Sequence, residues 1–237
     1  DYLEGPEFSF MCFVNGENVY PMPLSQDHKR AYDNDEGPNT GGMGAYTPLP
    51  FVTEEDEAFA RKYILEAVAK GMCQEGLPLT GVLYGGLMKT AQGVKVIEFN
   101  ARFGDPETEV VLPLLESDAY DVFYGIATGT NSQSPIANSP LQWRNEATIG
   151  VVLASKGYPG SYTKGAVIEG TELFDGPIFH MGTKNDNGVL KTNGGRVMMC
   201  IATGKDIATA REKVYKEIEK IHCDNLFYRK DIAHWAL

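Results

Sequence analysis

Two oxygen-bearing side chains stand two positions apart in the segment Val94-Lys-Val-Ile-Glu-Phe-Asn100. This segment predicts a strand, and the strand period of two places Glu98 and Asn100 on one face. A carboxylate and an amide oxygen suit a hard cation such as Mg²⁺, which keeps its other positions for water and phosphate oxygens. Arg102 lies two positions after Asn100, so its side chain would point to the same side. Its guanidinium would stabilise charge that develops on a transferring phosphoryl group. The alternative is a solvated strand face that ends in a turn.

A second group of polar residues lies in a segment without hydrophobic periodicity, from residue 23 to 50. Gln26-Asp-His-Lys-Arg30 combines an acid, an imidazole and two cations, which together can bind a phosphate and orient an amine. Gly37-Pro-Asn-Thr-Gly-Gly-Met-Gly44 exposes backbone N–H groups that could cradle an anion. We expect an unusually long functional loop here, although a solvated turn and a flexible linker are the alternatives.

Two acids follow the first motif directly in Gly104-Asp-Pro-Glu107. Asp105 before a proline predicts the start of a helix that kinks or stops before Pro113. The same acids, Asp105 and Glu107, could instead hold a substrate amine. The later part of the chain has further glycine-rich turns. Arg196 comes directly after a double glycine in one of them, and it is the residue in these turns that we expect to contact a ligand.

The remaining elements must position these groups. Hydrophobic periodicity and turn residues predict a hairpin of residues 8–14 and 18–22, and then a helix from Thr53 to near Gly71. They also predict a second hairpin of residues 81–90 and 94–100, whose strands we expect to be central in the sheet. A helix is expected over residues 118–127. The polar stretch 130–140 is predicted to be a linker. Beyond it we expect strands at 147–154, 166–168, 178–181 and 196–202 and a helix that starts at Asp206.

Composition excludes several classes of protein. The chain of 237 residues has 21 basic and 32 acidic side chains and a net charge of −11, so nucleic acid and anionic membranes are poor partners. No apolar run approaches the roughly 20 residues that span a bilayer. We therefore expect a soluble protein, and its four scattered cysteines, without a C-x-x-C pair, predict buried thiols in a reducing cytosol.

Several of these segments, in the same order, resemble the glycinamide ribonucleotide synthetase (phosphoribosylamine–glycine ligase) family of the ATP-grasp superfamily. The resemblance rests on seven motifs: Leu3-Glu-Gly-Pro-Glu-Phe-Ser9, Gln26-Asp-His-Lys-Arg30, Gly37-Pro-Asn-Thr-Gly-Gly-Met-Gly-Ala-Tyr46, Val96-Ile-Glu-Phe-Asn-Ala-Arg-Phe-Gly-Asp-Pro-Glu-Thr108, Ala154-Ser-Lys-Gly-Tyr-Pro-Gly160, Thr192-Asn-Gly-Gly-Arg-Val197 and Tyr228-Arg-Lys-Asp-Ile232. The resemblance implies an α+β chain: the C-terminal half of an ATP-grasp domain over residues 1–129, and a small α+β C-terminal domain over residues 141–237.

The resemblance also implies an activity. ATP phosphorylates the carboxylate of glycine, and the amine of 5-phosphoribosylamine attacks the acyl phosphate in a step of de novo purine biosynthesis. The implied cofactors are ATP and Mg²⁺, with Mn²⁺ as an alternative ion, and the implied assembly is a monomer or weak homodimer. The alternatives are another ATP-grasp carboxylate–amine ligase and a non-catalytic nucleotide-binding module.

Residue roles follow from the same resemblance. Glu98 and Asn100 would hold the metal, Arg102 would contact the transferring phosphate, Leu3 would lie on the adenine-binding hinge, and Glu7 would reach the ribose. The candidates for the glycine and acyl-phosphate region are Asp27, Lys29, Asp105, Glu107, Gly41, Gly42 and Gly44.

The sequence also departs from the family pattern. Residues 81–90 contain no second acidic metal ligand, and Ala233 and Trp235 stand where the family has glycine and arginine. The family's N-terminal domain and first ATP-grasp half do not precede Asp1. We therefore expect this chain by itself to be inactive and to bind ATP poorly, which a fluorescence titration with ATP tests.

Overall fold

The computed structural model describes residues 2–129 and 141–237, and the predicted linker at 130–140 lies outside them. The chain forms two compact units that alternate along the sequence. The first unit comprises Asp1–Gln26, Leu49–Gly104 and Leu114–Asn145, and the second comprises Asp27–Pro48, Asp105–Pro113 and Glu146–Leu237. This grouping does not follow chain order, and the division into residues 1–129 and 141–237 stays a prediction.

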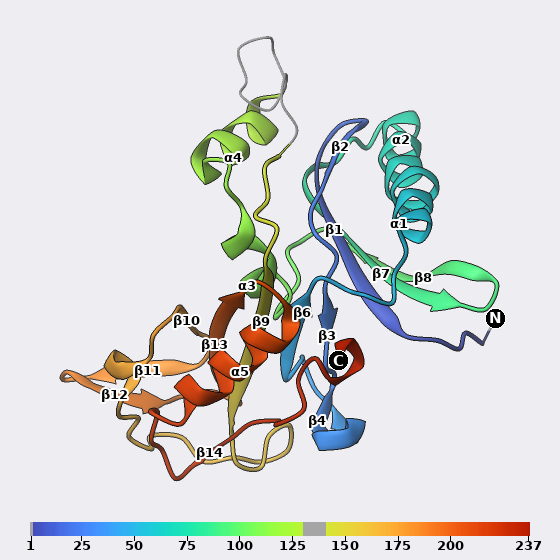
Figure 1. Ribbon diagram of the computed structural model, residues 1–237. Helices are drawn as coiled ribbons and strands as arrows, with labels where there is room; N and C mark the ends of the chain where they lie inside the picture. Colours follow the sequence, from blue (N-terminus) through green and yellow to red (C-terminus); the bar gives the residue numbers. More distant parts are fainter. Residues whose placement is uncertain (1, 130–140) are drawn as a thin grey trace. The chain divides into compact units, whose positions relative to one another are not determined.

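The first unit is built on a four-stranded antiparallel sheet with the order β2-β1-β7-β8 (Figure 1). Its strands are β1 (Glu7–Asn15), β2 (Asn18–Pro21), β7 (Thr80–Thr90) and β8 (Gly93–Asn100). Both predicted hairpins are therefore present. The expectation that β8 is central is wrong, because β8 lies at the edge of this sheet as described. Its position leaves Ile97 44% exposed and Phe99 39% exposed.

Helices cover both faces of the first sheet at β1. The helix α1 (Glu54–Ala60) continues through a π-helical turn, Arg61–Leu65, into α2 (Glu66–Gln74), and α4 spans Ala119–Thr128. Leu65 reaches Gly85, opposite Phe10, whereas the ring of Phe123 in α4 lies 5.7 Å from that of Phe13. Phe10 and Phe13 are three positions apart and so point to opposite faces. This explains why β1 is buried along nearly its whole length.

The predicted end of the first helix, near Gly71, is wrong by about one turn. The helix continues to Gln74 and is followed by Gly76, whose φ of 74° is the left-handed conformation that terminates helices. Gly71 lies inside the helix, where a Cβ would meet no other atom.

The second unit contains a larger sheet with the order β10-β13-β9-β6-β3, with β14 also paired to β9. Its members are β3 (Gln26–Asp27), β6 (Gly44–Thr47), β9 (Ala147–Ser155), β10 (Ile178–His180), β13 (Arg196–Gly204) and β14 (Leu226–Phe227). The helix α5 (Ile207–Ile218) packs on β9 and β13 through Ile207, Ala210, Val214 and Ile218, and Asp206 caps it as predicted. Val110 of α3 (Thr108–Val111) approaches Gly150 in β9. All residues of β9 are buried.

Some short elements differ from the sequence predictions. The supposed loop from residue 23 to 50 contains β3, β6 and the hairpin of β4 (Arg30–Tyr32) and β5 (Glu36–Asn39). Strands of two to four residues are too short to show periodicity. Residues 166–168 form only an isolated bridge, Val167 with Lys191. The sequence analysis missed the hairpin of β11 (Thr183–Asp186) and β12 (Val189–Thr192), although its Asn187-Gly188 turn is a recognised hairpin signal.

Candidate functional site

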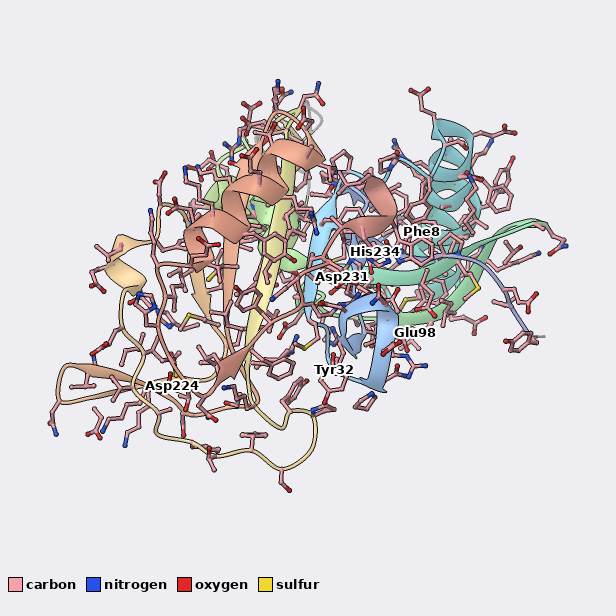
Figure 2. All side chains as sticks on the ribbon, turned by 60° about the horizontal axis from the view of Figure 1, so that its bottom comes forward. Phe8, Tyr32, Glu98, Asp224, Asp231 and His234 are labelled. Carbon is pink, nitrogen blue, oxygen red and sulfur yellow. The ribbon has the colours of Figure 1, made fainter. Side chains whose placement is uncertain are left out.

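In the first unit, Glu98 and Asn100 lie side by side on β8. The Asn100 Nδ2 atom donates a hydrogen bond of 3.0 Å to Oε1 of Glu98, so the prediction of a shared strand face is confirmed. Glu98 is exposed and is labelled in Figure 2. We call these two residues the β8 pair.

The chemistry of the β8 pair fits a magnesium ion. The pair supplies one carboxylate and one amide oxygen, and Mg²⁺ commonly takes only one or two protein ligands beside water and phosphate oxygens. In the described part of the chain, no three His, Cys, Asp or Glu residues group as they would in an all-protein metal site. The donor set therefore suits a metal that is bound together with a phosphate-bearing ligand.

The other predicted residues of the first unit flank this sheet. Arg102 follows the end of β8, is exposed, and donates from Nη1 to the carbonyl oxygen of Phe103 at 2.9 Å. Glu7 is the first residue of β1, and its carbonyl oxygen accepts a 2.6 Å hydrogen bond from Gln26 Nε2. Leu3 is half-buried before that strand. This hydrogen bond fixes the backbone at the start of β1.

In the second unit, Asp27 and Lys29 form an ion pair of 3.0 Å. Burial, and then the negative charge of Glu107, raise the pKa of Asp27, whereas Lys29 lowers it. Glu107 is itself buried at 3% exposure. The second unit thus brings together three of the acids and bases predicted from separate motifs.

The glycine loop, Gly41–Gly44, packs directly against this group. A Cβ on Gly42, where φ is 111°, would lie 2.4 Å from Cδ of Pro106 and 3.7 Å from Oδ2 of Asp27. A Cβ on Gly44 would lie 2.6 Å from the carbonyl oxygen of Gly150. Side chains are therefore excluded at both positions, and the loop backbone can approach a ligand closely.

Arg196 connects the glycine loop to Asp105. Its Nη1 atom donates to Oδ1 of Asp105 at 2.8 Å and to the carbonyl oxygen of Gly41 at 2.9 Å. Asp105 is therefore bound to Arg196, and the helix that it was predicted to cap instead begins at Thr108 after Glu107. The sequence predicts Arg196 as a ligand contact because it follows a double glycine. Tyr158, whose hydroxyl accepts a hydrogen bond of 3.1 Å from the Gly41 N–H, was missed.

Glu109 was also missed by the sequence analysis. Its Oε2 atom is buried without a hydrogen-bond partner in the described structure. Burial, with smaller contributions from Asp105 and Glu107, raises the pKa of Glu109 to about 7, although Arg196 opposes this change. The sequence offered no signal for it, because one more acid in the first turn of a helix is ordinary.

The segment that carries Asp27 and Lys29 is anchored by the C-terminal part of the second unit. His28 is buried, and its Nε2 atom accepts a 3.0 Å hydrogen bond from the Ala233 N–H. Burial lowers the pKa of His28, so the imidazole is neutral at pH 7. Ala233 has a φ of 65°, a left-handed conformation in which the family's glycine is favoured.

Arg229 lies beside this anchor with its side chain fully buried. It donates to Asp35 Oδ1 at 2.9 Å and to both carboxylate oxygens of Asp231 at 2.7 Å. Asp231 Oδ2 also lies 3.6 Å from Nδ1 of His234, and both residues are labelled in Figure 2. We call Arg229, Asp35 and Asp231 the Arg229 cluster.

The predicted site residues therefore fall into two sets, one in each unit. The first unit contains Leu3, Glu7, Glu98, Asn100 and Arg102, and the second contains Asp27, Lys29, Gly41, Gly42, Gly44, Asp105 and Glu107. Within the second set, direct contacts join Asp27 to Lys29, and Arg196 joins Asp105 to Gly41.

Comparison with known proteins first assigns the class. A family model described as "Phosphoribosylglycinamide synthetase, ATP-grasp (A) domain" matches residues 1–108. A second model, "Phosphoribosylglycinamide synthetase, C domain", matches residues 148–235. The class is thus ATP-grasp. Because the two models together match most of the chain, it belongs to the phosphoribosylglycinamide synthetase family.

Curated relatives agree with this assignment. The chain is 50% identical to a phosphoribosylamine–glycine ligase of Halalkalibacterium halodurans, a match that covers 100% of the chain and 54% of the relative. It is 50% identical to the ligase of Listeria innocua, covering 98% and 55%. It is 45% identical to the trifunctional purine biosynthetic protein adenosine-3 of Gallus gallus, covering 24% of that protein. The chain spans about half the length of the ligases that it matches.

Solved structures confirm the predicted α+β fold class. The phosphoribosylamine–glycine ligase of Thermotoga maritima matches with a TM-score of 0.88 and 37% identity, over 98% of this chain and 57% of that one. The biotin carboxylase domain of a thermophilic 2-oxoglutarate carboxylase matches with a TM-score of 0.62 at 14% identity, and shares the fold. No helix in residues 2–129 or 141–237 is long and apolar enough to cross a membrane.

Proposed function

We propose that the protein that contains this chain is an ATP-dependent ligase that joins glycine to 5-phosphoribosylamine. The products are glycinamide ribonucleotide, ADP and phosphate, and the reaction belongs to de novo purine biosynthesis. The observation that carries the proposal is the β8 pair, whose oxygen donors suit Mg²⁺, in a chain that is 50% identical to a named phosphoribosylamine–glycine ligase.

The first unit would bind the nucleotide. Glu98 and Asn100 would hold Mg²⁺, or Mn²⁺ in its place, and Arg102 would contact the transferring phosphate. When bound, the divalent ion neutralises charge on the phosphates. Leu3 would contact the adenine and Glu7 the ribose hydroxyls. Among the structural neighbours, a biotin carboxylase domain is described in complex with MgADP, which supports a magnesium nucleotide here.

The second unit would bind the amino acid and its acyl phosphate. Asp105 and Glu107 would receive the amino group, and the Asp27–Lys29 pair and the backbone of Gly41, Gly42 and Gly44 would surround the carboxylate as it becomes phosphorylated. Positioning and charge neutralisation dominate phosphoryl transfer of this kind. Opposite charges a few ångströms apart suit a substrate that carries both an ammonium and a carboxylate.

Other properties follow the same proposal. The net charge of −11 supports small-molecule substrates over nucleic acid or anionic membranes. We also propose a cytoplasmic protein that is a monomer or a weak homodimer, with the domain division at residues 130–140.

The proposal is tested by measuring ADP release from the full-length protein with phosphoribosylamine and a series of carboxylates. We expect glycine to give the highest kcat/KM. A higher value for a different carboxylate would assign the protein to another ATP-grasp carboxylate–amine ligase. Absence of ADP release with every carboxylate would instead indicate a non-catalytic nucleotide-binding module.

A further inference from the structure

A polar cavity of about 490 Å³ lies in the second unit. Five of its lining residues can ionise or donate hydrogen bonds: Asp105, Glu109, Tyr158, His180 and Arg196. The lining includes one permanent cation and two carboxyl groups. Such a set suits a ligand that is rich in hydroxyl and amino groups.

The size of the cavity favours the larger of the two substrates to be joined. Ligand pockets are commonly about 300–1,000 Å³ in volume. Glycine has only five non-hydrogen atoms and would leave most of this cavity empty, whereas the ribosylamine part of 5-phosphoribosylamine has hydroxyls and an amine that match its lining.

Arg196 fixes one wall of this cavity. Its guanidinium is bound to Asp105 at 2.8 Å and to the Gly41 carbonyl oxygen at 2.9 Å. The ion pair compensates part of the negative charge of Asp105, whose side chain stays about half exposed. Glu109 differs, because its Oε2 atom is buried and has no hydrogen-bond partner in the described structure.

We infer that this cavity binds the amine substrate and that Glu109 is the catalytic residue that accepts the proton from its nitrogen. The inference rests on the proposed function. As the amine nitrogen forms a bond to the carbonyl carbon, the bond from that carbon to the phosphate oxygen breaks, and phosphate leaves with the electron pair. The surplus proton on nitrogen passes to the Glu109 carboxylate.

The surroundings of Glu109 suit this role. Its pKa of about 7 allows a carboxylate to accept a proton near neutral pH, where general bases work best. The charged groups that act on it are Asp105 and Glu107 from the preceding turn and Arg196 from β13, and His180 of β10 and Tyr158 line the same cavity. Asp105 and Glu107 raise the pKa of Glu109 and Arg196 lowers it.

The test separates the two halves of the reaction in the full-length protein. Hydroxylamine traps the acyl phosphate as a hydroxamate in the absence of the ribosylamine, whereas amide formation needs both substrates. We expect Glu109→Gln to keep hydroxamate formation within about threefold of wild type and to lower the rate of amide formation by about 100-fold or more. The matched control, Glu172→Gln, changes an exposed acid of the same unit and should alter neither rate.

The pH profile provides a second readout. With wild type, single-turnover amide formation should rise with pH and level off above about 7, because only the ionised carboxylate accepts a proton. Glu109→Gln should lack this rise, and Glu109→Asp should restore it in part. Equal losses of hydroxamate and amide in Glu109→Gln, or a wild-type profile without the rise, would overturn the inference. If wild type forms no hydroxamate from glycine, the proposed function itself fails.

Discussion

The β8 pair and the Arg229 cluster both contain carboxylates, but they are held in opposite ways. Glu98 is exposed on an edge strand and contacts the Asn100 amide. Asp35 and Asp231 are bound by a guanidinium whose side chain is fully buried. A carboxylate that is kept accessible can bind a ligand, whereas one that is neutralised by a buried cation maintains the backbone. The comparison predicts that substitutions in the two regions affect different measurements.

The largest expected effect is on stability in the Arg229 cluster. Arg229→Ala should lower the free energy of unfolding by about 3 kcal/mol, because removing the buried guanidinium leaves two half-buried carboxylates uncompensated. Chemical denaturation of the full-length protein measures this change. Lys213→Ala is the control, since it breaks an exposed ion pair of 3.8 Å with Asp175 and should cost less than about 1 kcal/mol. Equal effects of the two variants would remove the distinction between the regions.

The next effect is on catalysis at the β8 pair. Glu98→Gln should lower kcat of the full-length protein by at least about 100-fold, a scale typical of losing one electrostatic stabiliser. The melting temperature should stay unchanged, because Glu98 is exposed. Glu55→Gln, an exposed acid in α1, is the control. Wild-type turnover in Glu98→Gln would contradict the metal assignment.

The Arg229 cluster should also respond to acid. The His28 imidazole, whose Nδ1 lies 3.7 Å from Oδ1 of Asp35, and the Arg229 guanidinium together hold the pKa of Asp35 well below its usual range. Although burial alone raises the pKa of Asp231, hydrogen bonds from Arg229 and the Asn34 N–H lower it to about 2 from the ordinary 3.8. Because these values are lowered by folding, the stabilisation is present above pH 3.8 and is lost as pH falls towards 2.

Acid unfolding monitored by circular dichroism tests this. Arg229→Ala should begin to unfold at a higher pH than wild type, but its stability should depend less steeply on pH between 4 and 2. An unchanged slope would show that the cluster is not the acid-sensitive element.

The smallest effect concerns a helix start in the first unit. Thr53 Oγ1 accepts a hydrogen bond from the Asp56 N–H at 3.2 Å, and Asp56 Oδ2 accepts one from the Thr53 N–H at 3.1 Å. Thr53→Ala should therefore cost about 1 kcal/mol of unfolding free energy. Thr53→Ser keeps the oxygen and should cost less, and kcat should not change in either variant. A matching loss of kcat would link this helix to the site.

The placement of the candidate site residues could be predicted where the sequence signal was local. The strand period fixed Glu98 and Asn100 on one face, and the glycine and charge motifs indicated Asp27, Lys29 and the loop before any contact was visible. The edge position of β8 was not predictable, because hydrophobic pattern alone does not identify the neighbours of a strand.

The remainder depends on contacts between distant parts of the sequence. Asp35 and Arg229 are 194 positions apart, and Arg196 meets Gly41 across 155 positions. The periodicity of a single helix or strand does not indicate contacts between residues so far apart in the sequence. Glu109 is inconspicuous in sequence, because its raised pKa arises from burial in the folded unit.

The central claim is that the glycine carboxylate is phosphorylated before the amide forms. Full-length protein supplied with ATP, phosphoribosylamine and glycine labelled with ¹⁸O in its carboxylate tests this directly, with the phosphate analysed by mass spectrometry. The account predicts one ¹⁸O atom in each phosphate released, because the carboxylate oxygen leaves with the phosphoryl group. Unlabelled phosphate alongside amide product would contradict it.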